Sequence, residues 1–344
     1  MKVDVDDEAA TTTLLRHITA SFRSAFCSFS MLARLQFKFV SYQSLFALCV
    51  LLLIYQIYTI RSAHDDIALP IQETVQAPKY EGIPRVIWYK LGPRGLSEEA
   101  RNWTDSCITS NPEYEAHFMT DESSDEYVRT AFASRPDIVN NYLALPVPIW
   151  KADLLRYLLL WDQGGIWFDL DVSCENIPID DWIPSEYKAN TSLVVGWEFD
   201  HGWPDNYLHQ MEIWAIMAKP RSPHLMQAID DVLEELAKKT AEHGVAVEDT
   251  TMEMMGDVVD FTGPRRLTYA VYKSLGAMVN RNLAGSDVEK ILQPKLVGEV
   301  LFMPGRSFAP MTNRYSAEEE AVLSPQLVTH HYAGTWKNSH GGER

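Results

Sequence analysis

Residues 161–173, WDQGGIWFDLDVS, decide how the rest of the chain is interpreted. Two glycines interrupt a helical pattern, a short apolar run typical of a buried strand follows, and Asp169 and Asp171 come at its end. Side chains alternate along a strand, so these two carboxylates point the same way and repel each other unless a cation lies between them. The tripeptide alone is too short to distinguish such a cation site from a turn with two solvated aspartates.

Around this stretch, β-branched and aromatic runs alternate with amphipathic segments. The predicted strands are residues 83–91, 113–119, 166–170, 191–199, 210–218, 297–303 and 326–332, and the predicted helices are 97–110, 121–133, 150–161, 222–239 and 264–275. Such alternation predicts an α/β fold with a mostly parallel sheet, in one domain over residues 83–338. Ligands of open α/β sheets bind beyond the carboxyl ends of strands, where the two aspartates are expected.

The N-terminal region differs from the rest of the chain. Residues 39–60 form an uncharged apolar run, and about 20 such residues cross a bilayer core as a helix. Basic residues precede the run and acidic ones follow it, so the positive-inside rule makes residues 1–38 a cytosolic tail and places residues 61–82, a stem, across the membrane. A cleaved signal peptide is the alternative, but its leader would be too long. We therefore expect an uncleaved signal-anchor of a single-pass type II protein.

Charge and cysteine usage narrow the function classes. The net charge is −17, and after residue 62 acidic side chains exceed basic ones by 19, which argues against nucleic acid as a partner. A phosphate-bearing ligand would need a cation in such surroundings. Beyond the apolar run, Cys107 and Cys174 either form a disulfide or remain two buried thiols. The tripeptides at Asn102 and Asn190 fit N-glycosylation on the same side of the membrane.

The segment WKADLLRY, residues 150–157, leads directly into the glycine pair. Asp153 and Arg156 are three residues apart and share one face of the predicted helix. They form either an ion pair on the helix surface or a ligand site, in which Asp153 accepts hydrogen bonds from sugar hydroxyls and Arg156 positions an anionic ligand.

Several ordered motifs resemble glycosyltransferase family 32, including its fungal α-1,6-mannosyltransferases, which begin the outer chain of N-glycans. They are IPRVIW (83–88), ADLLRY (152–157), GGIWFDLD (164–171), IWAIMAKPRSPHL (213–225), DFTGPRRLTYAVY (260–272) and HHYAGTWK (330–337). The resemblance implies a single GT-A domain, which is Rossmann-like. It further implies metal-dependent, retaining transfer of a hexose, most simply mannose from GDP-mannose in α-1,6 linkage to an N-glycan or related mannoside. The implied location is the Golgi membrane with the catalytic domain luminal, in a complex with other Golgi mannosyltransferases.

The resemblance also assigns roles to residues. Asp169 and Asp171 would hold Mn²⁺ or Mg²⁺ on the donor diphosphate, with His330 or its neighbour His331 as a third ligand. Outside the matched motifs, Glu198 or Asp200 would stabilise the oxocarbenium-like centre, or the acceptor would attack from the leaving-group face. The residues implied to contact substrates are Asp153 and Arg156 at the donor sugar, Trp88 at the base, Gly165 after the sugar-contacting helix, Thr262, Gly263 and Pro264 on the acceptor side, and Trp336 in the last motif.

Three alternatives remain open on the sequence. The acceptor could be an inositol sphingolipid rather than an N-glycan. The runs FDLDVS (168–173) and MGDVVD (255–260) resemble motifs of haloacid-dehalogenase-like phosphatases, although that nucleophile strand normally opens its domain. A membrane-anchored sugar-binding protein without turnover would also fit, but the presence of all four charged motif residues disfavours it.

Overall fold

The computed structural model describes residues 55–56, 82–204, 209–283, 285–334, 337–338 and 340–342. The chain divides into two compact units, Met1–Gln76 and Ala77–Arg344, and the α/β domain lies in the second. The predicted tail, membrane span and stem fall outside the described residues except for Tyr55, Gln56 and Gly82. Within the described part of the chain, no helix has the length and apolarity needed to cross a membrane.

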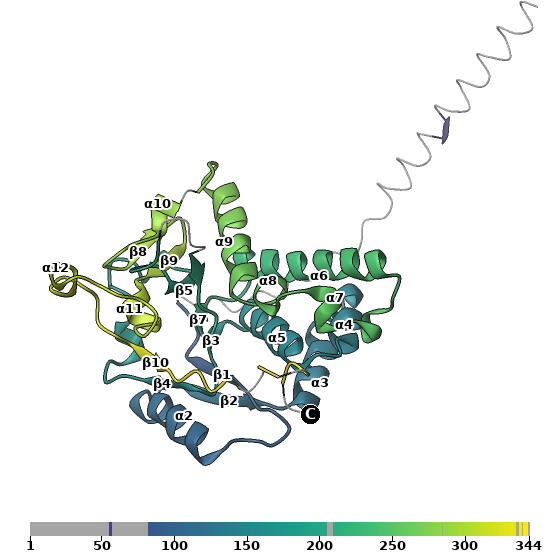
Figure 1. Cartoon of the computed structure of the whole chain (residues 1–344), viewed down its shortest axis with the longest axis horizontal. Coiled ribbons are helices and arrows are strands. Elements are labelled where there is room, and N and C mark those ends of the chain that lie inside the picture. Colours follow the sequence, from purple (N-terminus) through teal and green to yellow (C-terminus); the bar gives the residue numbers. More distant parts are fainter. Residues whose placement is uncertain are drawn as a thin grey trace, which may run out of the picture. The chain divides into compact units, whose positions relative to one another are not determined.

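An eight-stranded sheet forms the centre of the domain, with the order β2-β1-β3-β7-β5-β9-β8 and β6 paired to β5 (Figure 1). The main-sheet strands are β1 (Val86–Lys90), β2 (Glu115–Met119), β3 (Gly165–Phe168), β5 (Leu193–Phe199), β6 (Gln210–Met211), β7 (Ala215–Ala218), β8 (Lys295–Val297) and β9 (Val300–Met303). Strands β2, β1, β3, β5 and β9 run in one direction, whereas β7, β6 and β8 run in the other. The sheet is therefore mixed but mostly parallel, as predicted.

Helices and short helical turns connect the strands. They are α2 (Glu98–Ser110), α3 (Asp121–Ala131), α4 (Pro136–Ala144), α5 (Pro148–Asp162), η1 (Ile179–Asp181), α6 (Pro223–His243), η2 (Val247–Asp249), α7 (Met252–Met255), α8 (Val258–Phe261), α9 (Pro264–Met278), α10 (Gly285–Val288), α11 (Gly305–Phe308) and α12 (Ala317–Glu320). Proline stands at the first turn of α4, α5, α6 and α9, where its missing N–H costs no intrahelical bond.

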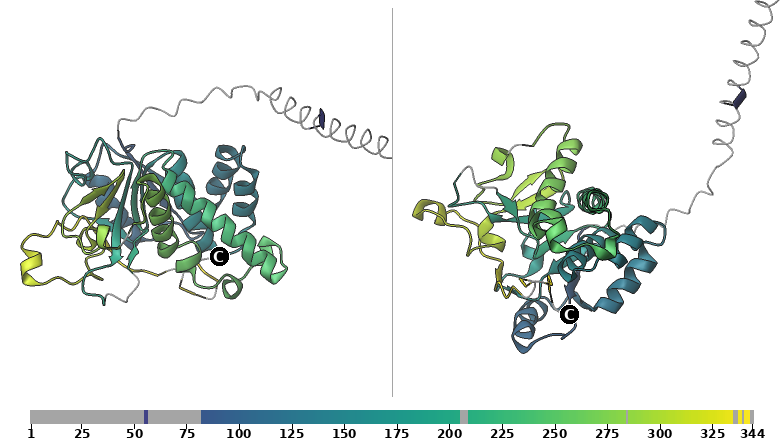
Figure 2. Two further views of the ribbon diagram at one scale, coloured as in Figure 1. Left: turned by 90° about the horizontal axis from the view of Figure 1, so that it is seen from above. Right: turned by 45° about the vertical axis from the view of Figure 1, so that its right-hand side comes forward.

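Two hydrophobic cores cover the two faces of the sheet (Figure 2). Trp88 and Trp167 belong to the core that contains residues of α5, α6 and α9. Ile87 and Phe168, their neighbours along β1 and β3, belong to the core that contains Cys107 of α2 and Phe308 of α11. This alternation is the two-residue period of a strand buried on both faces. The sheet is thus the middle layer, and its strand ends are free to form a site.

The glycine pair makes the tight junction between α5 and β3. Gly164 and Gly165 have φ angles of +69° and +97°, which disfavour residues with a side chain. A Cβ on Gly165 would lie 2.6 Å from the Val86 carbonyl oxygen of the neighbouring strand. Gly165 is fully buried, so the predicted substrate contact is wrong. Its role is to let β3 approach β1 closely.

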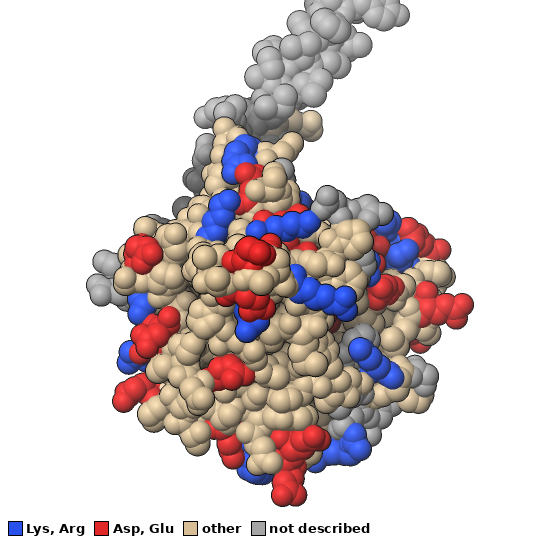
Figure 3. Space-filling model, turned by 60° about the vertical axis from the view of Figure 1, so that its left-hand side comes forward, with Lys and Arg blue, Asp and Glu red and all other residues tan. Residues whose placement is uncertain are grey.

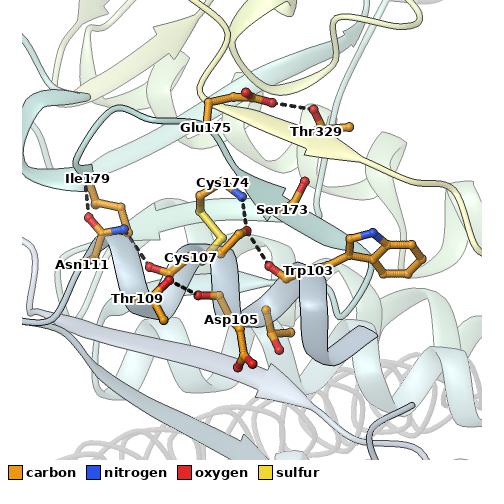
Figure 4. The surroundings of a disulfide bond; sticks show 12 residues. Trp103, Asp105, Cys107, Thr109, Asn111, Ser173, Cys174, Glu175, Ile179 and Thr329 are labelled. Atoms are coloured by element: carbon orange, nitrogen blue, oxygen red, sulfur yellow. Dashed lines mark hydrogen bonds between the residues drawn. A yellow bond between two sulfur atoms is a disulfide. The ribbon is translucent and has the colours of Figure 1, made fainter. Parts of the chain in front are cut away.

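A second, two-stranded sheet lies against the first one and continues the aspartate motif. It consists of β4 (Val172–Cys174) and β10 (Val328–His330), which run antiparallel with His330 opposite Val172. The Cys107–Cys174 disulfide joins α2 to β4 (Figure 4). Of the two states left open by the sequence, the structure has the paired one. This small sheet brings residues from the end of the chain to the residues after β3.

Candidate active site

A cavity of about 760 Å³ lies at the carboxyl ends of β1, β3 and β5. Its wall contains the turn after β1, one face of α2, the N-terminal half of α5, the aspartate motif, the end of β5 and residues after β10. Ligands of open α/β sheets bind at this edge, where loops rather than strands provide the side chains.

Asp169, Asp171 and His330 come together in this cavity. One ligand atom of each lies within 4.8 Å of the others, which makes them a group able to hold a metal ion. His330 Nε2 lies 3.2 Å from Asp171 Oδ1. His331 is turned elsewhere, toward the Ser173 hydroxyl at 2.8 Å. Of the two histidines that the sequence left open, the structure brings His330 to the aspartates.

The surroundings orient this cluster. The backbone N–H of Ala333 donates to Asp171 Oδ2 at 2.9 Å, and the His330 ring stacks on Trp214 with 4.1 Å between centroids. Burial raises the pKa of the Asp171 carboxyl, but the hydrogen bond and charge of His330 outweigh that effect and hold the pKa below its usual value. Asp171 is therefore an ionised ligand at neutral pH, and carboxylate and imidazole atoms suit Mn²⁺ or Mg²⁺.

Arg156 is the cation that lies beneath the cluster. Its Nη2 atom lies 3.1 Å from Asp153 Oδ1 and 3.2 Å from Asp169 Oδ1, and Nη1 donates to the Ile213 carbonyl. Arg156 and Asp153 are almost fully buried yet line the cavity. Burial raises the Asp153 pKa to about 6, although Arg156 and the Thr262 hydroxyl oppose this shift. Asp153 and Arg156 thus form the i,i+3 ion pair, and this buried pair also borders the cavity.

The loop 262–264 meets α5 from the opposite side of the cavity. Thr262 donates its hydroxyl hydrogen to Asp153 Oδ2 at 2.8 Å, and its carbonyl accepts from the Tyr157 hydroxyl at 2.8 Å. Gly263 and Pro264 line the cavity, but Thr262 is fully buried behind it. The loop is thus at the site, with Thr262 acting through Asp153 rather than by facing a ligand.

Glu198 lines the cavity at the end of β5, as the sequence predicted for a residue near the reacting centre. Gln210 donates to Glu198 Oε2 at 2.7 Å. Burial raises the Glu198 pKa, and the Gln210 hydrogen bond together with the charges of His330 and Lys337 offsets only part of that shift.

Asp200, two residues further on, has a different environment, and the predicted catalytic role is wrong. Its side chain is fully buried outside the cavity. Both carboxylate oxygens accept from the backbone N–H of Lys290 at 2.8 Å, and His209 Nδ1 lies 3.1 Å from Oδ1. With these bonds made, Asp200 holds the segment at Lys290 in place.

Trp88 does not face the cavity either, so the predicted base contact is wrong. It is 9% exposed in the core, stacks on His117, and donates from Nε1 to the Gly164 carbonyl at 2.9 Å. Strand β1 is buried on both faces, and the Trp88 side chain therefore packs in the core instead of facing a ligand. Trp336 lies outside the described residues.

Several residues of the site had no signal of their own in the sequence. Trp103 and Gln210 line the cavity, and Glu212 lies fully buried beside Arg156, where burial raises its pKa well above the usual value. Tyr332 is the exception, because it belongs to the HHYAGTWK motif and lines the cavity with a φ angle of +52°. Its unusual backbone conformation turns the chain directly after the metal-site histidine.

Charged side chains of both signs lie on the surface of the domain. On the face shown in Figure 3, acidic and basic side chains are interspersed rather than gathered by sign. With a net charge of −17, such a surface offers no single-sign positive field for a polyanion.

Comparison with known families finds a match to the region around the Asp-x-Asp motif. Residues 97–189 match the family described as the glycosyltransferase sugar-binding region containing a DXD motif. This match and the curated relatives bear out the predicted resemblance and the predicted enzyme class, a glycosyltransferase.

The similar proteins of known activity are mannosyltransferases. The chain is 29% identical over 277 residues to the initiation-specific α-1,6-mannosyltransferase of Schizosaccharomyces pombe, covering 76% of this chain and 66% of that protein. It is 26% identical over 310 residues to the protein of the same name from Candida albicans, covering 80% and 78%. A shorter stretch of 92 residues is 36% identical to inositol phosphoceramide mannosyltransferase 3 of S. pombe, covering 27% and 25%. The chain thus spans just under two thirds of the first relative.

Proposed function

We propose that the protein transfers mannose from GDP-mannose to a mannoside acceptor in α-1,6 linkage, with a divalent cation and retention of anomeric configuration. The observation that carries this proposal is the Asp169–Asp171–His330 group, which opens into a 760 Å³ cavity. The similarity to initiation-specific α-1,6-mannosyltransferases over three quarters of the chain supports mannose as the sugar and an α-1,6 linkage.

The donor set fits the implied metal. Two carboxylates and one imidazole are hard or borderline ligands, and the Nδ1 atom of His330 is buried without a hydrogen-bond partner among the described residues. When bound, Mn²⁺ or Mg²⁺ would act as a Lewis acid on the donor diphosphate. Asp169, Asp171 and His330 would hold it, and the Ala333 N–H would keep Asp171 oriented.

The remaining residues bind and orient the sugar. Asp153 offers buried carboxylate oxygens to the sugar hydroxyls, and Arg156 fixes that carboxylate and Asp169 at the same time. Glu198 lies on the far wall, where a carboxylate can stabilise positive charge that develops at the anomeric carbon. Trp214 and the chain after β10 cover the centre and exclude water.

We further propose the cellular setting that the sequence suggests. Residues 83–338 would form one GT-A domain in the Golgi lumen, held by a signal-anchor at residues 39–60, and would work beside other Golgi mannosyltransferases. A disulfide between Cys107 and Cys174 supports an oxidising compartment for this domain, because such bonds persist on the luminal side of membranes.

A second acceptor class has its own support. The 92-residue stretch similar to inositol phosphoceramide mannosyltransferase 3 has a higher identity than either longer alignment. An inositol phosphoceramide acceptor would bring a membrane-bound anion to the cavity, whereas an N-glycan acceptor would be neutral.

A transfer assay with the full-length protein tests the proposal. Radiolabelled GDP-mannose is incubated with Mn²⁺ and either an N-glycan core or an inositol phosphoceramide, and UDP-glucose serves as the control donor. We expect label in the N-glycan, in a bond that α-1,6-mannosidase cleaves. Label in the lipid alone would show that the acceptor is the inositol phosphoceramide. Transfer from UDP-glucose alone would contradict GDP-mannose as the donor.

A further inference from the structure

The cavity has a position for a nucleotide base that the sequence motifs do not identify. Strand β1 lies between β2 and β3, so the chain leaves β1 toward one side for β2 and returns on the other side as β3. Such a change of direction opens a crevice beyond the carboxyl ends of the two strands, and nucleotides bind there. The turn after β1 and helix α2 form one wall of this crevice, and Asp169 and Asp171 form the other.

One face of α2 presents two complementary side chains to the crevice. Glu99 and Trp103 are four residues apart, share a helix face, and both line the cavity. Among the residues that the structure describes, Glu99 makes neither an ion pair nor a side-chain hydrogen bond. Glu99 is exposed, so its carboxylate is available to a ligand in the cavity.

Trp103 is built as a rigid platform. Its indole ring stacks on His331 with 4.4 Å between centroids and a 9° interplanar angle. The Ser173 hydroxyl lies 2.8 Å from His331 Nε2, which holds the supporting ring in place. One face of Trp103 is thus covered by protein, while the side chain remains partly exposed in the cavity.

The platform is tied to the same small sheet as the metal-site residues (Figure 4). The disulfide joins α2 to β4 one helical turn after Trp103. Ser106 accepts a hydrogen bond from the Cys174 N–H at 2.9 Å and donates to the Trp103 carbonyl at 2.6 Å. The Trp103 ring therefore keeps a constant position relative to Asp171, the ligand two residues before Ser173.

We propose that Trp103 stacks on the nucleobase of the donor and that Glu99 selects guanine. This inference rests on the proposed GDP-sugar donor. Guanine presents adjacent N1–H and N2–H donors on one edge, and the two oxygens of a carboxylate accept both. Uracil presents a single N–H between two carbonyl oxygens, which a carboxylate repels. The pair thus favours GDP over UDP, and the base lies on Trp103 rather than on Trp88.

The test is calorimetric titration of the full-length protein with GDP and with UDP in the presence of Mn²⁺. Stacking on an aromatic side chain contributes about 1–3 kcal/mol per base, so Trp103→Ala should weaken GDP binding by about 5- to 150-fold. Trp103→Phe, which keeps an aromatic face, should lose less. Trp103→Leu keeps bulk against His331 without stacking, so its GDP binding should weaken by the same 5- to 150-fold. This variant provides the test if the alanine variant fails to fold.

Glu99→Gln tests selectivity separately from stacking. It should weaken GDP binding about 10-fold, because guanine uses both carboxylate oxygens, and should strengthen UDP binding, because the repulsion of the uracil carbonyl oxygens is removed. Glu98→Gln is the matched control, since Glu98 is the adjacent exposed carboxylate of α2 and does not line the cavity.

The outcomes separate this inference from the proposed function. If the leucine and Glu99→Gln variants bind GDP as the wild type does while GDP-mannose still supports transfer, the base lies elsewhere and only this inference is overturned. If the wild type binds UDP and not GDP, the proposed donor is wrong and the role of Glu99 is overturned with it.

Discussion

Two clusters of carboxylates and histidines lie at the ends of neighbouring segments, and they differ in what their oxygens already bind. In the first, Asp169, Asp171 and His330 border a cavity. In the second, Asp200 is fully buried and accepts bonds from the Lys290 backbone and His209. The residue types are the same in both clusters. Only the first has ligand atoms turned toward space that a substrate could occupy.

The difference shows why carboxylates at one strand end can bind a ligand while a carboxylate at another strand end stabilises the fold. After β3, the small sheet β4–β10 brings His330 beside Asp171. Asp169, Asp171 and His330 all border the cavity. After β5, the carboxylate of Asp200 instead replaces missing backbone partners at Lys290. A buried carboxylate that lies away from the cavity and has its hydrogen bonds satisfied stabilises structure and is unavailable to a ligand.

Chelation should have the largest effect on the first cluster and none on the second. We expect EDTA to abolish mannose transfer and added Mn²⁺ to restore it, because the diphosphate would otherwise meet two uncompensated carboxylates. Circular dichroism in EDTA should be unchanged, since Asp200 and the core need no cation. Full activity in EDTA would contradict a metal role for Asp169 and Asp171.

Isosteric substitutions sharpen the comparison. Asp169→Asn and Asp171→Asn should each lower the rate of transfer by at least about 100-fold, because an amide is a weaker metal ligand. Asp200→Asn is the matched control. It should keep the rate near that of wild type while lowering the free energy of unfolding by about 1–2 kcal/mol, since a charged acceptor at Lys290 is lost.

The reverse pattern would exchange the two roles. If Asp200→Asn were inactive yet as stable as wild type, while Asp171→Asn retained turnover, the second cluster would be catalytic and the first structural.

The disulfide should matter more to the first cluster, because it clamps the small sheet. Cys107 and Cys174 are 67 residues apart, and the chain-entropy model gives such a crosslink roughly 4 kcal/mol of stabilisation. We expect Cys107→Ser with Cys174→Ser to shift the urea midpoint down by a corresponding amount. An equal midpoint for the double variant and the wild type would mean that the remaining packing of α2 on β4 is sufficient.

A third histidine environment should affect stability only at acidic pH. His224 in α6 is fully buried, with Ser274 Oγ 2.7 Å from Nδ1, and burial lowers its pKa to about 4 despite Glu299 nearby. Because the folded pKa lies below the unfolded value, the unfolded chain binds the proton first as the pH falls below about 6.5. This costs up to about 3 kcal/mol of stability by pH 4.

Urea unfolding at pH 4–7 checks this assignment. His224→Gln should show a smaller loss of stability over that range than wild type, whereas His243→Gln, at the exposed end of the same helix, should match wild type. Identical slopes for His224→Gln and wild type would show that other groups account for the acid sensitivity.

The sequence predicted the parts of the fold that depend on local pattern. The alternation of apolar runs gave the order of strands and helices, and the glycine pair before Asp169 marked the junction of α5 and β3. The antiparallel strand β7 within the sheet was not predicted, because direction depends on distant pairing rather than on local sequence.

The site was predictable where short spacing defines geometry. Asp169 with Asp171, and Asp153 with Arg156, are linked by strand and helix periods, and the HHYAGTWK motif indicated His330. Trp88 and Asp200 were misplaced because burial and hydrogen-bond satisfaction depend on the whole fold. Trp103 was missed for the same reason, since its support by His331 joins residues far apart in the chain.

Direct measurement of Mn²⁺ binding tests the central claim that the first cluster is the cation site. Free Mn²⁺ is titrated by electron paramagnetic resonance in the presence of GDP, with wild type, Asp171→Asn and Asp200→Asn as folded full-length proteins. We predict one bound ion in the wild type and in Asp200→Asn, and none in Asp171→Asn at the same concentrations. Retention of the ion by Asp171→Asn, or its loss from Asp200→Asn alone, would contradict the account.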